Sequence, residues 1–241
     1  MFRTLFFYPA IAIPLIISLL FTLRVNALNK KGKTKEADIL AYKVTSWWTK
    51  VVMWATGSKI TITGLENIPK DETLLVVSNH QSYFDIPLLM STLPFPKGFI
   101  SKKELGSWPI VRIWMSKIKC VFMDRDNMRK SAEAIVDGIN LLKDGHSMVI
   151  FPEGTRSKGG PTHEFKAGSF KLATKSLATV LPVTINGTYN LREVNEKRRI
   201  KSASIHLIIH EPIHTASLSK EELTELPKMV EDVIVNAIEK E

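Results

Sequence analysis

The sequence has almost no cysteine. Cys120 is the only one among 241 residues, so no disulfide can form within the chain. Thiols stay reduced in a cytoplasm, whereas small secreted domains depend on disulfides. We therefore expect the protein to work facing a cytoplasm. The chain also has no internal repeat and no low-complexity segment, and its length suits one domain of catalytic size, with or without an appended element.

Acidic residues are fewer than basic ones, 24 Asp and Glu against 33 Lys and Arg, which gives a net charge of +9. Such an excess often indicates a nucleic-acid partner. Here it is concentrated at one end, because residues 1–58 carry eight basic and two acidic side chains and the other 183 residues carry a net charge of only +3. The basic segment also adjoins the longest apolar run. We therefore expect an anionic lipid surface, and no nucleic acid, as the partner.

That apolar run, residues 4–23, contains no charged side chain. At about 1.5 Å per residue, a helix of this length matches a hydrocarbon core of about 30 Å. Pro9 and Pro14 interrupt its hydrogen bonding, so a helix that dips into one leaflet is as acceptable as one that spans. A signal peptide ending near Ala27 is a further alternative. The lysines of residues 30–35 favour the cytoplasmic side of a membrane, the inner membrane if the protein is bacterial.

Residues 37–54 have the period of an amphipathic helix. Apolar residues recur at helical spacing, whereas Lys43, Ser46 and Lys50 fall on the opposite face. Three of the five tryptophans lie in this segment, and tryptophan favours the headgroup level of a membrane. We expect the helix to lie along the membrane interface; a helix that packs on the core is the alternative.

Beyond residue 58, short apolar runs alternate with helical patterns. The predicted strands are 59–63, 74–78, 98–101, 120–123, 148–151, 180–185 and 204–209. The predicted helices are 86–92, 108–117, 128–143, 165–178 and 219–239. The alternation predicts an α/β domain with a mixed, largely parallel sheet flanked by helices. We therefore divide the chain into a membrane-associated helix pair, residues 1–58, and a catalytic domain, residues 59–241.

Polar residues that could take part in catalysis follow several of these strands. His80 and Asp85 come directly after the strand 74–78. Histidine exchanges a proton near neutral pH, and a carboxylate can orient its ring, so the two residues make a candidate base and its orienter. Taken alone, one His-x4-Asp pattern is weak evidence in a chain with six histidines.

A second polar stretch, residues 151–157, follows another strand and reads Phe-Pro-Glu-Gly-Thr-Arg-Ser. An arginine fork suits a phosphate, glycine lets backbone N–H groups approach an oxyanion, and Glu153 can accept from a substrate hydroxyl. Charged residues also end two other strands, at Arg125 and at Lys102 and Lys103. Each of these turns taken singly is more often a solvated surface feature.

Four of these motifs, in this order and spacing, make the chain resemble the 1-acylglycerol-3-phosphate acyltransferases, also called lysophosphatidic acid acyltransferases. The motifs are the His-x4-Asp block 79–85, the block 122–125, the Phe-Pro-Glu-Gly-Thr-Arg-Ser block 151–157 and the apolar proline block 180–183; 102–105 and 165–168 also resemble family segments. The resemblance covers residues 60–209, with a weaker similarity in the N-terminal helix pair. One departure is that Lys119 or Cys120 stands where the second block usually opens with glycine.

The resemblance implies a mechanism. His80, held by Asp85, would deprotonate the sn-2 hydroxyl of lysophosphatidic acid as that oxygen attacks an acyl thioester, supplied by acyl-CoA or acyl carrier protein, and phosphatidic acid would form. No metal and no further cofactor is expected. The family motifs assign acceptor binding to Glu153, Gly154, Thr155, Arg156, Arg125, Lys102 and Lys103. Related acceptors, glycerol 3-phosphate or another lysophospholipid, and a non-catalytic lipid-binding protein of the same fold are the alternatives.

Two other chemistries fit the residues less well. The segment His210 to His214 has the letters His-Glu-x-x-His of zinc proteases, but Pro212 and the preceding strand predict a turn at the strand end. A covalent acyl-enzyme would need Ser82 or Cys120 as its nucleophile. The chain has no Gly-x-Ser-x-Gly motif, and a cysteine in an apolar strand is ordinarily buried and inert.

Overall fold

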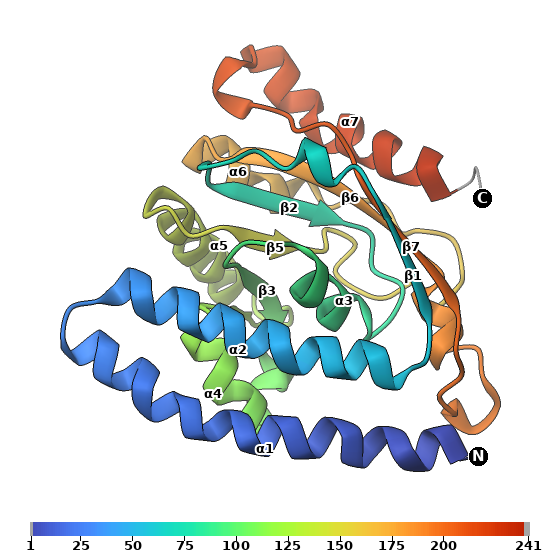
Figure 1. Ribbon diagram of the computed structural model, residues 1–241. Coiled ribbons are helices and arrows are strands. Elements are labelled where there is room, and N and C mark those ends of the chain that lie inside the picture. Colours follow the sequence, from blue (N-terminus) through green and yellow to red (C-terminus); the bar gives the residue numbers. More distant parts are fainter. Residues whose placement is uncertain (1, 239–241) are drawn as a thin grey trace.

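A seven-stranded sheet lies at the centre of the molecule, of which the computed structural model describes residues 2–238 (Figure 1). The strands are β1 (Lys59–Thr63), β2 (Leu74–Ser78), β3 (Gly98–Lys102), β4 (Val121–Met123), β5 (Met148–Ile150), β6 (Thr179–Asn186) and β7 (Ser204–Ile209). Their order is β1-β7-β6-β2-β5-β3-β4, and every neighbouring pair is parallel except β6 and β7. The predicted mixed, largely parallel sheet is confirmed.

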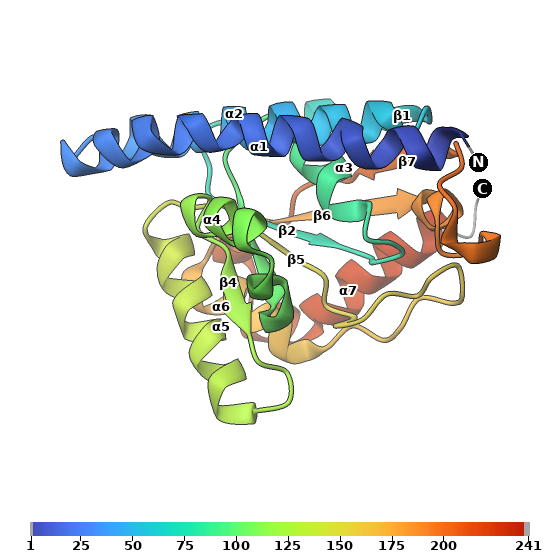
Figure 2. The same cartoon turned by 90° about the horizontal axis from the view of Figure 1, so that it is seen from below.

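Within residues 2–238, seven α-helices surround the sheet in two layers (Figure 2). They are α1 (Phe2–Lys30), α2 (Thr34–Ala55), α3 (Asp85–Thr92), α4 (Pro109–Lys117), α5 (Met128–Lys143), α6 (Lys171–Ser176) and α7 (Lys220–Ile238). Side chains of β2 alternate between the layers: Leu74 and Val76 join the core under α2 and α3, whereas Leu75 and Val77 join the core under α5, α6 and α7. Both faces of β2 are therefore buried, as a parallel strand requires.

One predicted helix differs from the observed structure, and one predicted turn agrees with it. The helix predicted at 165–178 is a 3₁₀ turn, Ala167–Phe170, followed by the short α6, because the preceding segment is extended and Lys166 still has β geometry. The segment 210–214 is not helical: β7 ends at Ile209, and Ile213 forms a bridge with Val180. That segment is the strand-end turn that Pro212 predicted.

The N-terminal helices form an antiparallel pair that lies along one side of the sheet (Figure 1). α1 continues without interruption through Pro9 and Pro14 and exposes much of its apolar surface. Several hydrogen bonds tie it to the rest of the molecule. Among them, Trp114 Nε1 donates to Ser18 Oγ at 2.7 Å, the backbone N–H of Ile200 donates to Thr4 Oγ1 at 3.1 Å, and Arg3 bonds the carbonyl of Thr56. The division at residue 58 stays a prediction.

α2 packs on the core through small side chains, and this corrects the predicted orientation of its polar face. Ser46 was expected on the solvent side but is buried, together with Ala41, Thr45 and other small residues. Trp47 and Trp54, which were expected at the headgroup level of a membrane, are 42% and 69% exposed. Small residues allow close approach to the neighbouring elements, so α2 is a core-packing helix that presents two tryptophans outward.

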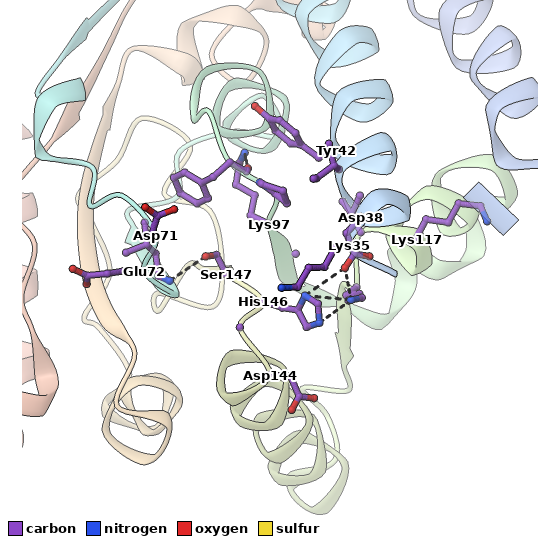
Figure 3. A pocket seen from close by; sticks show the side chains of 18 of the residues that line it. Lys35, Asp38, Tyr42, Asp71, Glu72, Lys97, Lys117, Asp144, His146 and Ser147 are labelled. Atoms are coloured by element: carbon purple, nitrogen blue, oxygen red, sulfur yellow. Dashed lines mark hydrogen bonds and ion pairs between the residues drawn. The ribbon is translucent and has the colours of Figure 1, made fainter. Parts of the chain in front are cut away.

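A cavity of about 490 Å³ lies at the edge of the sheet where β2, β3 and β5 begin (Figure 3). Lys97 lines it and is only 4% exposed. Its ammonium group donates to the carbonyls of Leu93 and Phe95, both at 2.9 Å, and lies 4.8 Å from the centre of the Tyr42 ring. Burial lowers the pKa of Lys97 to about 7. The cavity is at the opposite edge of the sheet from the motif loops, so we expect Lys97 to affect the stability of the protein.

We expect Lys97→Met to stabilise the protein near pH 7 by a few kcal/mol, because burying the ammonium is costly and methionine has a similar shape. In the wild type, the unfolded chain holds the Lys97 proton at pH values where the folded protein has released it. The free energy of unfolding should therefore rise between about pH 7 and the unfolded pKa of 10.5, and the advantage of Lys97→Met should shrink over that range.

Denaturant unfolding of both proteins in detergent, repeated from pH 6 to pH 10, measures this difference. Lys35→Met is the matched control, because Lys35 lines the same cavity with a side chain exposed to water. Parallel stability curves for the wild type and Lys97→Met would contradict the prediction.

Candidate active site

The predicted base and orienter meet at the carboxyl end of β2. His80 Nδ1 lies 2.7 Å from Asp85 Oδ2, and Asp85 opens α3 after the tight turn that follows His80. The Asp85 carboxylate holds this turn together, because the backbone N–H groups of Gln81 and Ser82 donate to the same oxygen at 2.7 and 2.9 Å. The sequence between the two residues therefore fixes their relative position.

Asp85 is fully buried, and each of its oxygens has a partner. Besides the donors to Oδ2, Thr188 Oγ1 donates to Oδ1 at 2.5 Å from the segment that follows β6. These donors surround the carboxylate, which also accepts a hydrogen bond from His80 Nδ1. The proton on Nδ1 leaves Nε2 with a free lone pair, and His80 is set to act as a base through Nε2.

Residues of the loop after β5 hold His80 from its other side. The Phe151 ring stacks on the imidazole, with 4.1 Å between ring centres and 16° between planes. Glu153 is buried, and its two oxygens accept the backbone N–H groups of His80 and His163. Burial raises the pKa of Glu153, and these hydrogen bonds oppose the rise. Glu153 thus joins the turn that carries His80 to the Phe151–Ser157 loop. A contact of Glu153 with substrate stays a prediction.

Arg156 projects from the same loop beside the base. The next residue, Ser157, donates its backbone N–H to the carbonyl of His80 at 2.8 Å. The Arg156 guanidinium carbon lies 3.5 Å from the centre of the Tyr83 ring, and Nη1 is 3.3 Å from Glu193 Oε1. An arginine fork has five N–H donors, so most of them stay available to a phosphate.

The other predicted acceptor contacts lie at the ends of β3, β4 and β5. Arg125 Nη1 bonds the carbonyl of Gly154, which has the positive φ of +72° that favours glycine. Lys103 pairs with Asp124 at 2.7 Å, and Lys102 pairs with Glu104 at 3.2 Å. Thr155 is exposed. The structure thus brings Arg125 against the Phe151–Ser157 loop, whereas both lysines are held by neighbouring carboxylates on the surface.

Sequence reasoning missed two residues that build the site, Thr188 and Glu193. Both follow β6, and neither belongs to one of the recognised motifs. Their role depends on β6 lying beside β2 in the sheet, which places the segment after β6 against the His80 turn. Asn186-Gly187-Thr188 at a strand end was the only local signal, because glycine permits the turn, with a φ of +86° at Gly187.

The covalent alternatives find no support in the geometry. Ser82 Oγ donates to Glu193 Oε2 at 2.8 Å and has no histidine partner to activate it. Burial raises the pKa of Cys120 to about 12, so its thiolate does not form near neutral pH. Direct transfer with His80 as base is the chemistry that these contacts favour.

Residues 59–186 match the family model described as Acyltransferase, which is more than half of the chain. The 1-acyl-sn-glycerol-3-phosphate acyltransferase of Borreliella burgdorferi is 35% identical over 192 residues, 79% of this chain and 76% of that protein. This chain belongs to the acyltransferase family. Among plant relatives, the chloroplastic 1-acyl-sn-glycerol-3-phosphate acyltransferase LPAT1 of Arabidopsis thaliana is 39% identical over 67% of this chain and 47% of its own length.

The fold of this acyltransferase is similar to that of a solved relative. The crystal structure of PlsC, the 1-acyl-sn-glycerophosphate acyltransferase of Thermotoga maritima, matches with a TM-score of 0.85 and 33% sequence identity. The match covers 99% of this chain and 94% of that one, so it includes the N-terminal helices as well as the sheet. The predicted family and the predicted fold are both confirmed.

Glu193 positions Arg156, so we expect Glu193→Gln to raise the KM for the acceptor about 5- to 10-fold, the effect of losing about one net hydrogen bond. The amide cannot pair with Arg156 as an anion does, although it can still accept from one backbone or side-chain donor. Steady-state kinetics with the acceptor varied should show little change in kcat. Glu196→Gln, an exposed change in the same segment, is the control. Equal losses in both variants would remove the positioning role.

Proposed function

We propose that this acyltransferase transfers an acyl group from an acyl thioester to the sn-2 hydroxyl of lysophosphatidic acid, forming phosphatidic acid for phospholipid synthesis. One observation carries the assignment: the His80–Asp85 pair and the Arg156 loop are joined at one edge of the sheet, by the hydrogen bond from Ser157 to the carbonyl of His80. A base for a hydroxyl and a donor for a phosphate therefore lie side by side. The relatives carry the matching activity in their names.

The reaction follows from the free lone pair on His80 Nε2. Nε2 takes the proton of the acceptor hydroxyl while that oxygen attacks the thioester carbonyl carbon, and a new C–O bond forms. As the tetrahedral intermediate collapses, the C–S bond breaks and the sulfur leaves with its electron pair and recovers the proton. Asp85 stabilises the imidazolium that forms in between. The acyl group passes directly to the lipid.

We assign the acceptor's phosphate to Arg156 first. Arginine gives two parallel charge-assisted hydrogen bonds to a phosphate, and the Tyr83 ring and Glu193 hold the Arg156 guanidinium in one orientation. Arg125 and the backbone of Gly154 are the next contacts, with Glu153, Thr155, Lys102 and Lys103 as outer ones. The acyl donor is acyl-CoA or acyl carrier protein, with no further cofactor.

We place the protein on a membrane through α1, at the cytoplasmic face. α1 is long and apolar enough to cross a bilayer, and only 11% of its most apolar window is buried. Its bonds to Trp114, Ile200 and Thr56 support a helix that lies along the domain and enters one leaflet, because a helix crossing alone would lose them. Trp47 and Trp54 of α2 suit the headgroup level beside it.

The test offers membranes that hold the purified protein a labelled acyl thioester with one of three acceptors: lysophosphatidic acid, glycerol 3-phosphate or lysophosphatidylcholine. We expect labelled phosphatidic acid to form at the highest kcat/KM. A clear preference for either of the other acceptors would replace the assignment, and binding of lipid without transfer would indicate a non-catalytic protein.

A further inference from the structure

A small cationic cavity of about 90 Å³ lies beside the base. Its lining is Tyr83, Arg156, Lys158, Arg192, Glu193 and Arg198. Four of these six side chains are cations and one is an anion, so the lining carries a net charge of +3. The cavity has room for a group about as large as a phosphate.

Arg192 is the least satisfied of these cations. Its Nε is buried and has no hydrogen-bond partner among the described residues. The guanidinium carbon lies 5.9 Å from the centre of the Tyr83 ring, on which Arg156 also packs. A buried N–H without an acceptor costs about 1–3 kcal/mol, and a cationic group costs more. A site that keeps such a donor next to three other cations is prepared to receive an anion.

Glu193 accounts for only part of that charge. Its Oε1 accepts from Arg156 and from the backbone of Tyr83, and its Oε2 accepts from Ser82 Oγ. The carboxylate is thus engaged toward the His80 turn and leaves Arg192, Arg198 and Lys158 without a carboxylate partner within residues 2–238. The uncompensated charge is local to this cavity, in contrast to Lys102 and Lys103, which have carboxylate partners.

We propose that Arg192 and Arg198 are specificity-determining residues that bind the phosphate monoester of the acceptor lipid together with Arg156. This inference rests on the proposed function. The acceptor is favoured over the acyl donor because only a few bonds separate the phosphate of lysophosphatidic acid from its sn-2 oxygen, and the cavity adjoins the His80 turn through Tyr83 and Arg156. The phosphates of an acyl-CoA lie at the far end of its long pantetheine arm.

Two properties of the cavity select a phosphate monoester. A monoester has a charge of about −1.5 to −2 near neutral pH, which suits the three uncompensated cations. A phosphodiester headgroup such as phosphocholine has a single negative charge and adds a cation, which the cationic lining repels. Arg192 and Arg198, which lie outside the recognised motifs, therefore discriminate between lysophosphatidic acid and lysophosphatidylcholine.

The experiment compares the full-length wild type with Arg192→Gln, Arg192→Lys and Arg198→Gln in the same membranes. We expect Arg192→Gln to raise the KM for lysophosphatidic acid at least tenfold, with kcat and the KM for acyl-CoA changed less than threefold. The preference for lysophosphatidic acid over lysophosphatidylcholine should fall in parallel. Arg192→Lys, which keeps the charge and loses the fork, should lie between the two. Arg199→Gln, on the same segment but outside the cavity, is the control and should behave as the wild type.

An unchanged acceptor KM in Arg192→Gln would overturn the proposal. A rise in the KM for acyl-CoA alone would also overturn it, because the cavity would then bind the acyl donor. If Arg192→Gln fails to fold, labelling of the wild type with the arginine reagent phenylglyoxal, read by mass spectrometry, decides instead. Lysophosphatidic acid should protect Arg192 and lysophosphatidylcholine should not; equal or absent protection rejects the site. A wild type that prefers another acceptor would reject the proposed function itself, whatever the variants do.

Discussion

Replacement of His80 by alanine is expected to lower kcat by about 10²- to 10⁴-fold, the range that a positioned general base contributes. No other side chain is placed to take over. Asp85 is buried and already accepts from four donors, and Glu153 uses both oxygens on backbone N–H groups. The measurement is initial rates with lysophosphatidic acid and a saturating acyl thioester.

Asp85→Asn extends this test to the tautomer of His80. An asparagine can present an N–H to Nδ1, and the proton would then move to Nε2, where the lone pair is needed. A large loss of kcat with a normal acceptor KM is expected. His214→Ala serves as the control, because His214 pairs with Glu72, which lines the cavity at the opposite edge of the sheet. If His80→Ala keeps most of its activity, the base mechanism must be abandoned.

The sheet was predictable from the sequence because its strands are short apolar runs bounded by turn residues. The first and last residues of each predicted strand lie within two positions of those of an observed strand. Pairing order was not predictable, because β1 joins β7 through contacts far apart in the chain. The polar face assigned to α2 was wrong at Ser46 since period alone does not show which face a neighbouring helix covers. α1 covers part of α2, and only the fold reveals it.

The active site shows the same difference between local patterns, which the sequence reveals, and contacts that depend on the fold. His80, Asp85 and Arg156 lie in local motifs at strand ends, where a sequence pattern identifies them directly. Thr188 and Glu193 act from beyond the end of β6, where Thr188 bonds Asp85 across 103 positions of the chain and Glu193 bonds Arg156 across 37. Glu153 shows the limit of a motif: its position was identified, whereas its contacts with two backbone N–H groups followed only from the fold.

Replacement of Arg156 by alanine should raise the KM for lysophosphatidic acid by about 10- to 100-fold. The phosphate loses charge-assisted hydrogen bonds, and a total net loss of about 1.5–3 kcal/mol corresponds to that range. Glu193 would also lose its cationic partner, and the Tyr83 ring would be uncovered. Because the contact is made with the bound acceptor and not with the reacting carbonyl, kcat at saturating acceptor should fall much less than kcat/KM.

Arg156→Lys separates charge from shape. A lysine keeps one positive charge but cannot form two parallel hydrogen bonds or stack as a plane on Tyr83, so its KM should lie between those of the wild type and Arg156→Ala. Arg129→Ala is the control, since Arg129 is an exposed arginine that pairs with Glu133 on α5, and exposed pairs contribute little. An acceptor KM that stays at the wild-type value in Arg156→Ala would place the phosphate elsewhere, and Arg125 beside Gly154 would then be the first position to test.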